Sequence, residues 1–154
     1  MGHRLTIAMT SWLATLQWAG DEPAHAELTV DVDSLSVLGG EGGLTPLTGA
    51  EKGVCRSNAL KSMDAKKFAK IRFTSDQIST TGDGYRLDGT LEIHGTSRPQ
   101  SVDLAVADTG DSLELSARVP VRQTDFGVKP FSLMMGALKV ADEVTIVFSA
   151  KRAK

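Results

Sequence analysis

The sequence has little of what marks several familiar classes of protein. Its one cysteine, Cys55, excludes a disulfide within the chain. It has no apolar run of about 18 residues, which a membrane-spanning helix needs, and no apolar core of about 7–15 residues near its start, as a signal peptide has. Its net charge of −2 gives no overall attraction to nucleic acid. We therefore expect a cytoplasmic protein without a nucleic-acid partner, or a periplasmic or secreted one if the N-terminus is trimmed.

What the sequence does have is a series of short segments in which apolar and polar residues alternate. Leu113, Leu115 and Ala117, for example, alternate with Ser112, Glu114 and Ser116. Side chains along a strand point to opposite faces in turn, so such segments predict strands that bury one face only. The expected strands are Arg4–Met9, Trp12–Trp18, Ala26–Val37, Lys70–Ser79, Tyr85–His94, Ser101–Ala107, Ser112–Val121 and Glu143–Ala150.

Glycine-containing turns join the middle strands. Gly82–Gly84 and Thr109–Asp111 are typical of hairpins, in which glycine supplies a positive φ. Gly95–Pro99 predicts a longer turn, with Pro99 at the entry of the next strand, where its missing N–H does no harm. The stretch from Lys70 to Val121 is therefore expected to be an antiparallel meander.

Two segments interrupt the strands. Gly39–Gly43 predicts a flexible loop, and Thr48 with Glu51 three residues later is typical of a capping box at the start of a helix that runs to about Met63. The second segment, Asp125–Val140, is too long for a hairpin loop and is rich in phenylalanine and methionine.

One helix is too little to cover the apolar face of this sheet, so the sheet is expected to close on itself. The predicted fold is one domain over residues 1–154, all-β with one main helix, an antiparallel β-barrel around an apolar lumen. Two outcomes remain open: the barrel's own side chains fill the lumen, or the lumen binds an apolar ligand. The residues expected to line it are Ile71, Phe73, Leu87, Leu91, Ile93, Val102, Leu104, Leu115, Phe126, Phe131, Met134, Met135 and Leu138.

The Asp125–Val140 segment supplies the last five of these residues, and it is expected to form either a lid at the mouth of the lumen or a plug that seals one end. The segment Glu51–Arg72 has a local net charge of +5. Within it, Lys61, Lys66 and Lys67 are the candidates to bind a charged head group or touch an anionic membrane surface. The alternative is a lysine-rich face in contact with solvent only.

No pattern of catalytic residues is present. His3, His25 and His94 lack the spacing of metal ligands, and His94 shares a polar strand face with Glu92, which predicts a surface position. Cys55 has no histidine nearby in the sequence and is expected to be an inert thiol. We expect no catalytic residues, no metal and no cofactor, and hence a protein that is not an enzyme.

The runs Lys70–Ser75 and Leu87–Pro99, followed by Thr124–Pro130 and Met134–Val144, together resemble the YceI-like family of lipocalin-like, polyisoprenoid-binding proteins, in the version common in actinobacterial members. The resemblance spans essentially the whole chain. It implies a lipocalin-like barrel whose lumen holds a long isoprenoid chain, such as a quinone tail or a polyprenyl phosphate. The competing hypothesis is a protein-interaction or structural module with a filled barrel and no ligand.

The chain departs from the family's pattern at its start. Family members usually have a strand before the segment that here begins Gly2–Ile7, and we expect that first strand to be absent or trimmed in this sequence. The barrel is then expected to close through another strand or another subunit. An open sheet edge at Arg4–Met9 favours self-association, and a homodimer is one expected form. Trp12 and Trp18 share one strand face and are expected in the barrel wall or rim.

Overall fold

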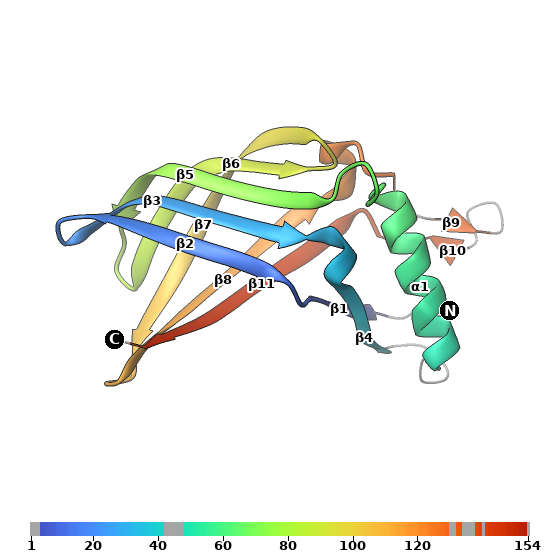
Figure 1. The fold of residues 1–154 in the computed structure, drawn as a ribbon, viewed down its shortest axis with the longest axis horizontal. Helices are drawn as coiled ribbons and strands as arrows, with labels where there is room; N and C mark the ends of the chain where they lie inside the picture. Colours follow the sequence, from blue (N-terminus) through green and yellow to red (C-terminus); the bar gives the residue numbers. More distant parts are fainter. Residues whose placement is uncertain (1–3, 42–47, 130–131, 134–137, 140, 154) are drawn as a thin grey trace.

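The computed structural model describes residues 4–41, 48–129, 132–133, 138–139 and 141–153 (Figure 1). Strands make up most of this part of the chain, and one α-helix, α1, spans Gly49–Ser62. Two short 3-10 helices are η1 (Val32–Ser34) and η2 (Gln123–Phe126). The strands are β1 Arg4–Met9, β2 Trp12–Ala19, β3 Glu22–Asp31, β4 Leu35–Glu41, β5 Lys70–Thr80, β6 Gly84–Ile93, β7 Thr96–Asp108, β8 Ser112–Arg122, β9 Ser132–Leu133, β10 Leu138–Lys139 and β11 Glu143–Ala153.

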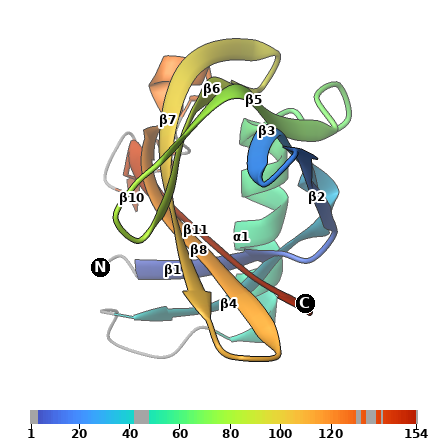
Figure 2. The same cartoon turned by 90° about the vertical axis from the view of Figure 1, so that its left-hand side faces the viewer.

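Seven strands form one sheet in the order β11-β8-β7-β6-β5-β3-β2, and every neighbouring pair is antiparallel. The predicted meander from β5 to β8 is confirmed. The sheet curls round, which brings its two edge strands, β2 and β11, to the same side of the molecule (Figure 2). The described part of the chain is thus a curled antiparallel sheet, as the alternating pattern predicted.

A two-stranded sheet of β1 and β4 lies beside α1 at one end of the large sheet (Figure 1). β1 pairs with β4 from Arg4↔Glu41 to Met9↔Leu35, and because this sheet has two strands, β1 still has one open edge at Arg4–Met9, as expected. The open edges of the large sheet are those of β2 and β11. A third small sheet pairs β9 with β10.

Helix α1 begins as its sequence predicts. The Thr48 hydroxyl accepts a hydrogen bond from the Glu51 backbone N–H, and the Glu51 carboxylate accepts one from the Thr48 N–H, both at 3.1 Å. Arg56 ties the helix to the neighbouring chain by donating to the carbonyls of Leu35 and Asp33, at 2.8 and 2.7 Å. No described helix is both long and apolar enough to cross a membrane.

The predicted single strand Ala26–Val37 is wrong, because η1 breaks it into β3 and β4. The Ser34 hydroxyl donates to the Asp31 carbonyl at 2.6 Å, and the Val32 N–H donates to the Ala69 carbonyl at 2.9 Å. Val32 itself is buried. The first part of the expected flexible loop is also wrong, since Gly39 belongs to β4; residues 42–43 lie outside the described part.

The turn after β6 is shorter than predicted. Ile93 pairs directly with Thr96, leaving His94 and Gly95, both at positive φ (56° and 74°), as a two-residue turn. A Cβ on Gly95 would lie 2.5 Å from the Phe68 ring, so only glycine fits there. The His94 ring packs against the same Phe68 ring, with centroids 4.6 Å apart. His94 is therefore half-buried in a turn, not on a strand's polar face as predicted.

Candidate functional site

The concave face of the sheet is lined by apolar side chains. Residues directly opposite each other on neighbouring strands share a face, so the register identifies which side chains point inward. Leu28, Phe73 and Leu91 form one such row across β3, β5 and β6. These rows surround the hydrophobic core, whose buried members are Ala26, Phe73, Leu87, Leu91, Ile93, Val121, Phe126 and Val128.

Burial is uneven around this lumen. Side chains at the middle of the sheet, such as Phe73 and Leu87, are buried. Inward-facing side chains on the edge strands remain accessible: Trp12 is 42% exposed and Ile146 38% exposed. Trp12 lies opposite Val30, and Ile146 lies opposite Val119. The lumen is thus packed on one side and open to solvent on the other.

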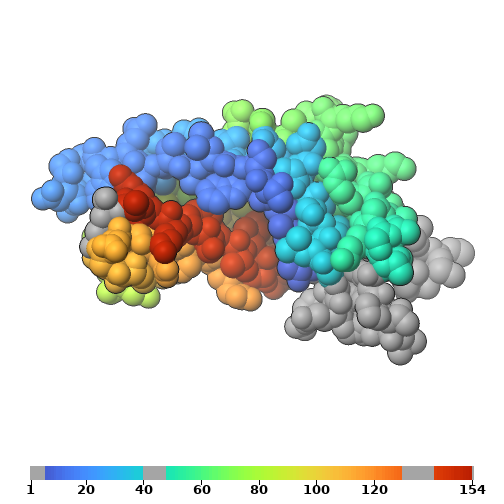
Figure 3. All heavy atoms as spheres, turned by 60° about the horizontal axis from the view of Figure 1, so that its bottom comes forward, coloured from blue at the N-terminus to red at the C-terminus, as the bar shows by residue number. Residues whose placement is uncertain are grey.

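The open side is the gap between the edges of β2 and β11. We call this gap the seam. One aromatic contact crosses it, between the rings of Trp12 and Phe148, whose centroids are 5.5 Å apart at an angle of 65°. Figure 3 shows β2 and β11 running side by side on this face, with a hollow between them through which more distant strands are visible.

The structure places the predicted lining residues in two groups. Buried ones pack into the core: Phe73, Leu87, Leu91, Ile93 and Phe126. Half-buried ones keep some accessible surface: Ile71, Val102, Leu104 and Leu115. Phe131, Met134 and Met135 lie outside the described residues, and Leu138 lies in β10 with its side chain outside the described part. The second group is the one that offers surface to a ligand.

The lining residues of β11 were not predicted from the sequence. Val144, Ile146 and Phe148 face inward, opposite Val121, Val119 and Ala117. Their alternation with Thr145 and Val147 is weak because Val147 is also apolar, so the face they occupy could be assigned only from the pairing with β8. Trp12 and Trp18 had been predicted in the wall or rim, and they are the corresponding residues of β2.

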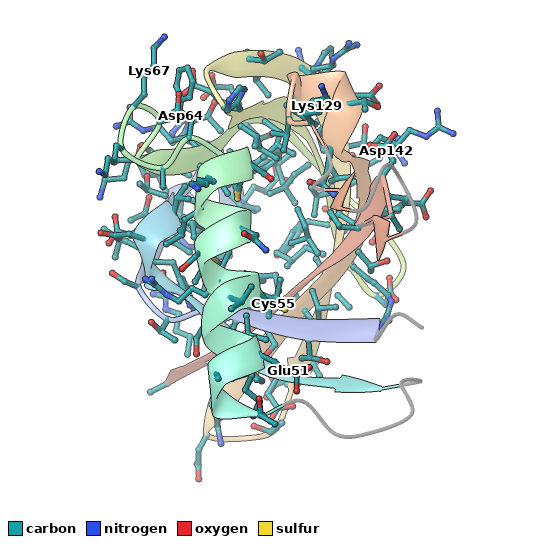
Figure 4. All side chains as sticks on the ribbon, turned by 90° about the vertical axis from the view of Figure 1, so that its right-hand side faces the viewer. Glu51, Cys55, Asp64, Lys67, Lys129 and Asp142 are labelled. Carbon is teal, nitrogen blue, oxygen red and sulfur yellow. The ribbon has the colours of Figure 1, made fainter. Side chains whose placement is uncertain are left out.

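The basic segment is partly used by the fold itself. Lys70 forms an ion pair with Asp31, and the hydrogen bond from Lys70 holds the pKa of the Asp31 carboxyl below its usual range. Lys61, Lys66 and Lys67 are exposed, and Lys67 extends away from the end of the sheet near α1 (Figure 4). The Lys67 ammonium also lies over the Phe68 ring, 5.3 Å from its centroid.

Titratable groups do not gather into a reactive cluster in the described part of the chain, where no three His, Cys, Asp or Glu side chains come together as metal ligands. His25 is the one histidine with acidic partners there: its Nδ1 lies 2.5 Å from Asp76 and its Nε2 lies 3.7 Å from Glu27. The hydrogen bond to Asp76 raises the pKa of His25 above its usual value. Cys55 is a half-buried free thiol.

Two shallow hollows lie away from the seam. One, of about 280 Å³, is lined by Arg98, Arg122, Asp125, Phe126 and their neighbours, between the start of β7 and the end of β8. The other, of about 460 Å³, lies over β5, β6 and β7 and includes Asp76 and Asp88. Both have mixed polar and apolar walls, unlike the lumen.

Residues 3–151 match the family model of the YceI-like domain. Among solved structures, the chain is similar to BcnA of Burkholderia cenocepacia, with 23% identity, a TM-score of 0.70, and coverage of 93% of this chain and 84% of that one. It is also similar to the YCEI protein of Campylobacter jejuni, with 14% identity, a TM-score of 0.68, and coverage of 97% and 84%. At these identities the two structures show the fold alone. No curated protein matches the chain.

Proposed function

Because this chain belongs to the YceI-like family, whose fold is lipocalin-like and polyisoprenoid-binding, we propose that its lumen binds the hydrocarbon chain of an isoprenoid lipid. The lipid is a quinone with an isoprenoid tail or a polyprenyl phosphate. The protein acts by binding and not by catalysis, and it takes up its ligand in the cytoplasm.

The observation that carries this proposal is the residual exposure of inward-facing apolar side chains. A barrel filled by its own residues would bury all of them, but Trp12, Trp18 and Ile146 are each more than a third exposed on the concave face. The lumen also offers no buried charge among the core residues. An apolar chain entering it would cover surface that the fold leaves in contact with water.

The energy available is enough for firm binding. An isoprene unit of roughly 100 Å² gains about 2.5 kcal/mol on burial, at about 25 cal/mol per Å². Ordering the lipid and losing its translational freedom cost several kcal/mol, so one unit alone would not be held. Several units in line along the strands would offset these costs.

The test is a series of isoprenoid alcohols of increasing length. We expect the affinity, followed by the fluorescence of Trp12 and Trp18, to rise with each added unit and then level off once the lumen is full. Native mass spectrometry of gently purified protein should show a retained lipid. A dissociation constant that does not change with chain length would overturn the proposal and favour a filled interaction module.

We further propose that Lys61, Lys66 and Lys67 contact the phosphate of a polyprenyl phosphate or an anionic membrane surface. All three are exposed, and no ion pair involves them in the described part of the chain. Changing all three to glutamine should weaken binding of a polyprenyl phosphate and leave the uncharged alcohol of the same length nearly unaffected. Added salt should have the same effect, because exposed charges are screened over roughly 10 Å at 0.1 M. Equal responses of the two ligands would contradict the contact.

A further inference from the structure

The large sheet has an opening between β7 and β8. The two strands pair over Ala105–Asp108 of β7, and around Pro99 of β7 and Pro120 of β8 they are not ladder partners. Figure 1 shows the two strands close together at the lower left and separating towards the opposite end. Proline has no N–H to donate to a ladder, so the sequence itself disfavours pairing at these two positions.

The hollow of about 280 Å³ described above lies at the separated end of this opening, and we call it the β7–β8 hollow. Helix η2 bounds it on one side, where the Arg98 Nε donates to the Asp125 carbonyl at 2.6 Å. Val121 and Phe126 line the hollow and are buried members of the core, so the core closes its inner side. Since pockets for drug-sized ligands measure about 300–1,000 Å³, this hollow suits a smaller molecule, of about amino-acid size.

Four charged side chains line the β7–β8 hollow, two of each sign. Arg98, Arg122, Asp125 and Glu143 come from β7, β8, η2 and β11 in turn. All four are exposed, and none of them forms an ion pair among the described residues. The bond from Arg98 to the Asp125 carbonyl uses its Nε and leaves its Nη atoms available. The hollow therefore presents donors for an anionic group and acceptors for a cationic group at the same time.

We propose that the β7–β8 hollow binds a free α-amino acid with an apolar side chain. A guanidinium binds a carboxylate through two parallel hydrogen bonds, so Arg98 and Arg122 face the carboxylate of the ligand. The Glu143 carboxylate accepts hydrogen bonds from the ammonium of the ligand. The exposed rings of Pro99 and Pro120 supply the apolar surface that the side chain of the ligand covers.

The balance of charge decides against simpler ligands. A phosphate or a dicarboxylate would lie close to Asp125 and Glu143, whose negative charges oppose it. An amine without a carboxylate would lie close to two guanidinium groups, which oppose it in the same way. A zwitterion satisfies both sets of charges. Because the core lies between this ligand and the lumen, the inference does not depend on lipid binding.

The test uses the intact, isotope-labelled protein without lipid, followed by two-dimensional proton–nitrogen NMR at about pH 6, where an α-amino group is charged. L-phenylalanine should shift the backbone amides of Arg98, Gln100, Arg122 and Phe126 and leave those of β2 unchanged. Three probes each lack one feature: N-acetyl-L-phenylalanine lacks the ammonium, L-phenylalanine amide lacks the carboxylate, and glycine lacks the apolar side chain. The first two should bind about two- to fivefold more weakly than phenylalanine, as expected for the loss of one exposed ion pair. Glycine should also bind more weakly, because it covers no proline surface.

Two variants assign these preferences to residues. Arg122→Gln should shrink the difference between phenylalanine and its amide, and Glu143→Gln should shrink the difference between phenylalanine and its N-acetyl form. Arg118→Gln is the matched control, because Arg118 is exposed on the same face of β8 and lies outside the hollow, so it should change neither difference. All three positions are exposed, so the variants should fold, which their NMR spectra would check.

Several results would overturn the site. These are no amide shifts with phenylalanine, shifts confined to another part of the protein, equal binding of phenylalanine, its amide and its N-acetyl form, or the same effect of Arg118→Gln and Arg122→Gln. None of these results bears on lipid uptake by the lumen, which is measured separately.

Discussion

Two adjacent residues of β11 allow a sharp test of the lumen as the lipid site. Ile146 faces inward and Val147 faces outward, and they are 38% and 62% exposed. The two positions are consecutive on β11, so an arginine at either one has the same neighbours in sequence and the same paired strand, β8. Only the face differs, so Ile146→Arg should impair lipid binding and Val147→Arg should not.

The expected size of the effect follows from the area that a ligand covers. An arginine at position 146 places a charge where an isoprene unit would lie, and exclusion of one unit costs about 2.5 kcal/mol of burial. At about 1.4 kcal/mol per tenfold change, this is a loss of roughly 60-fold in affinity. The guanidinium can reach solvent through the seam, so the loss of folding stability should be small.

The assay is the titration of each variant with one long isoprenoid alcohol, with Trp12 and Trp18 as the fluorescent reporters. Thermal unfolding of both variants serves as the control for folding. Leu104→Arg, deeper on the same concave face, should lose binding as well, with a larger loss of stability because Leu104 packs against the core. If the folded Ile146→Arg and Val147→Arg proteins bind the alcohol equally well, the ligand does not occupy the lumen.

Three further predictions concern stability. Because the pKa of His25 is raised in the folded protein, its contribution to the free energy of unfolding is complete below about pH 6.5 and is lost as the pH rises through the pKa of the folded state. The urea midpoint of unfolding should therefore fall as the pH rises across this range. Asp76→Asn should make the urea midpoint depend less on pH. Gly95→Ala should lower the free energy of unfolding, measured by chemical denaturation, by at least about 2 kcal/mol, because Gly95 has a positive φ and an added Cβ would clash with the Phe68 ring. An unchanged denaturation midpoint would contradict the turn geometry. Thr48→Ala should cost about 1 kcal/mol, or about 2–4 °C in Tm, with Thr48→Ser as the control that keeps the cap.

Sequence reasoning found the features that depend on near neighbours. Alternation and glycine-containing turns were sufficient to place β5, β6 and β8 and the meander that contains them, because a hairpin needs only adjacent strands and a short turn. The capping box of α1 is equally local, and Thr48 and Glu51 form it as expected. For such elements the chemistry that decides the structure lies within a few residues of sequence.

The features that sequence reasoning missed depend on distant contacts. The break at Val32 is held by the carbonyl of Ala69, and Arg56 of α1 binds the carbonyls of Asp33 and Leu35. No local sequence pattern in β3 or β4 predicts that Ala69 and Arg56 would be their hydrogen-bond partners. The partner of Arg4–Met9 was missed for the same reason, since the pairing of β1 with β4 joins segments far apart along the chain.

The pairing between β7 and β8 is much shorter than that of their other neighbours. It covers only Ala105–Asp108 of β7, whereas β6 pairs with β7 over its full length, from Gly84 to Ile93. Pro99, which has no N–H, lies in the part of β7 that has no partner on that side, and η2 bridges the opening through the hydrogen bond from Arg98 to the Asp125 carbonyl at 2.6 Å.

This short pairing predicts that the sheet opens as two cooperative units. Strands β2, β3, β5, β6 and β7 share continuous ladders, β8 and β11 share another, and the ladder that joins the two covers Ala105–Asp108. Protection against hydrogen exchange should therefore fall into two classes, one for each unit, with opening at the junction preceding global unfolding. If the exchange data show these two classes, we expect the lumen to widen at the junction of the two units while the ladders within each unit stay paired.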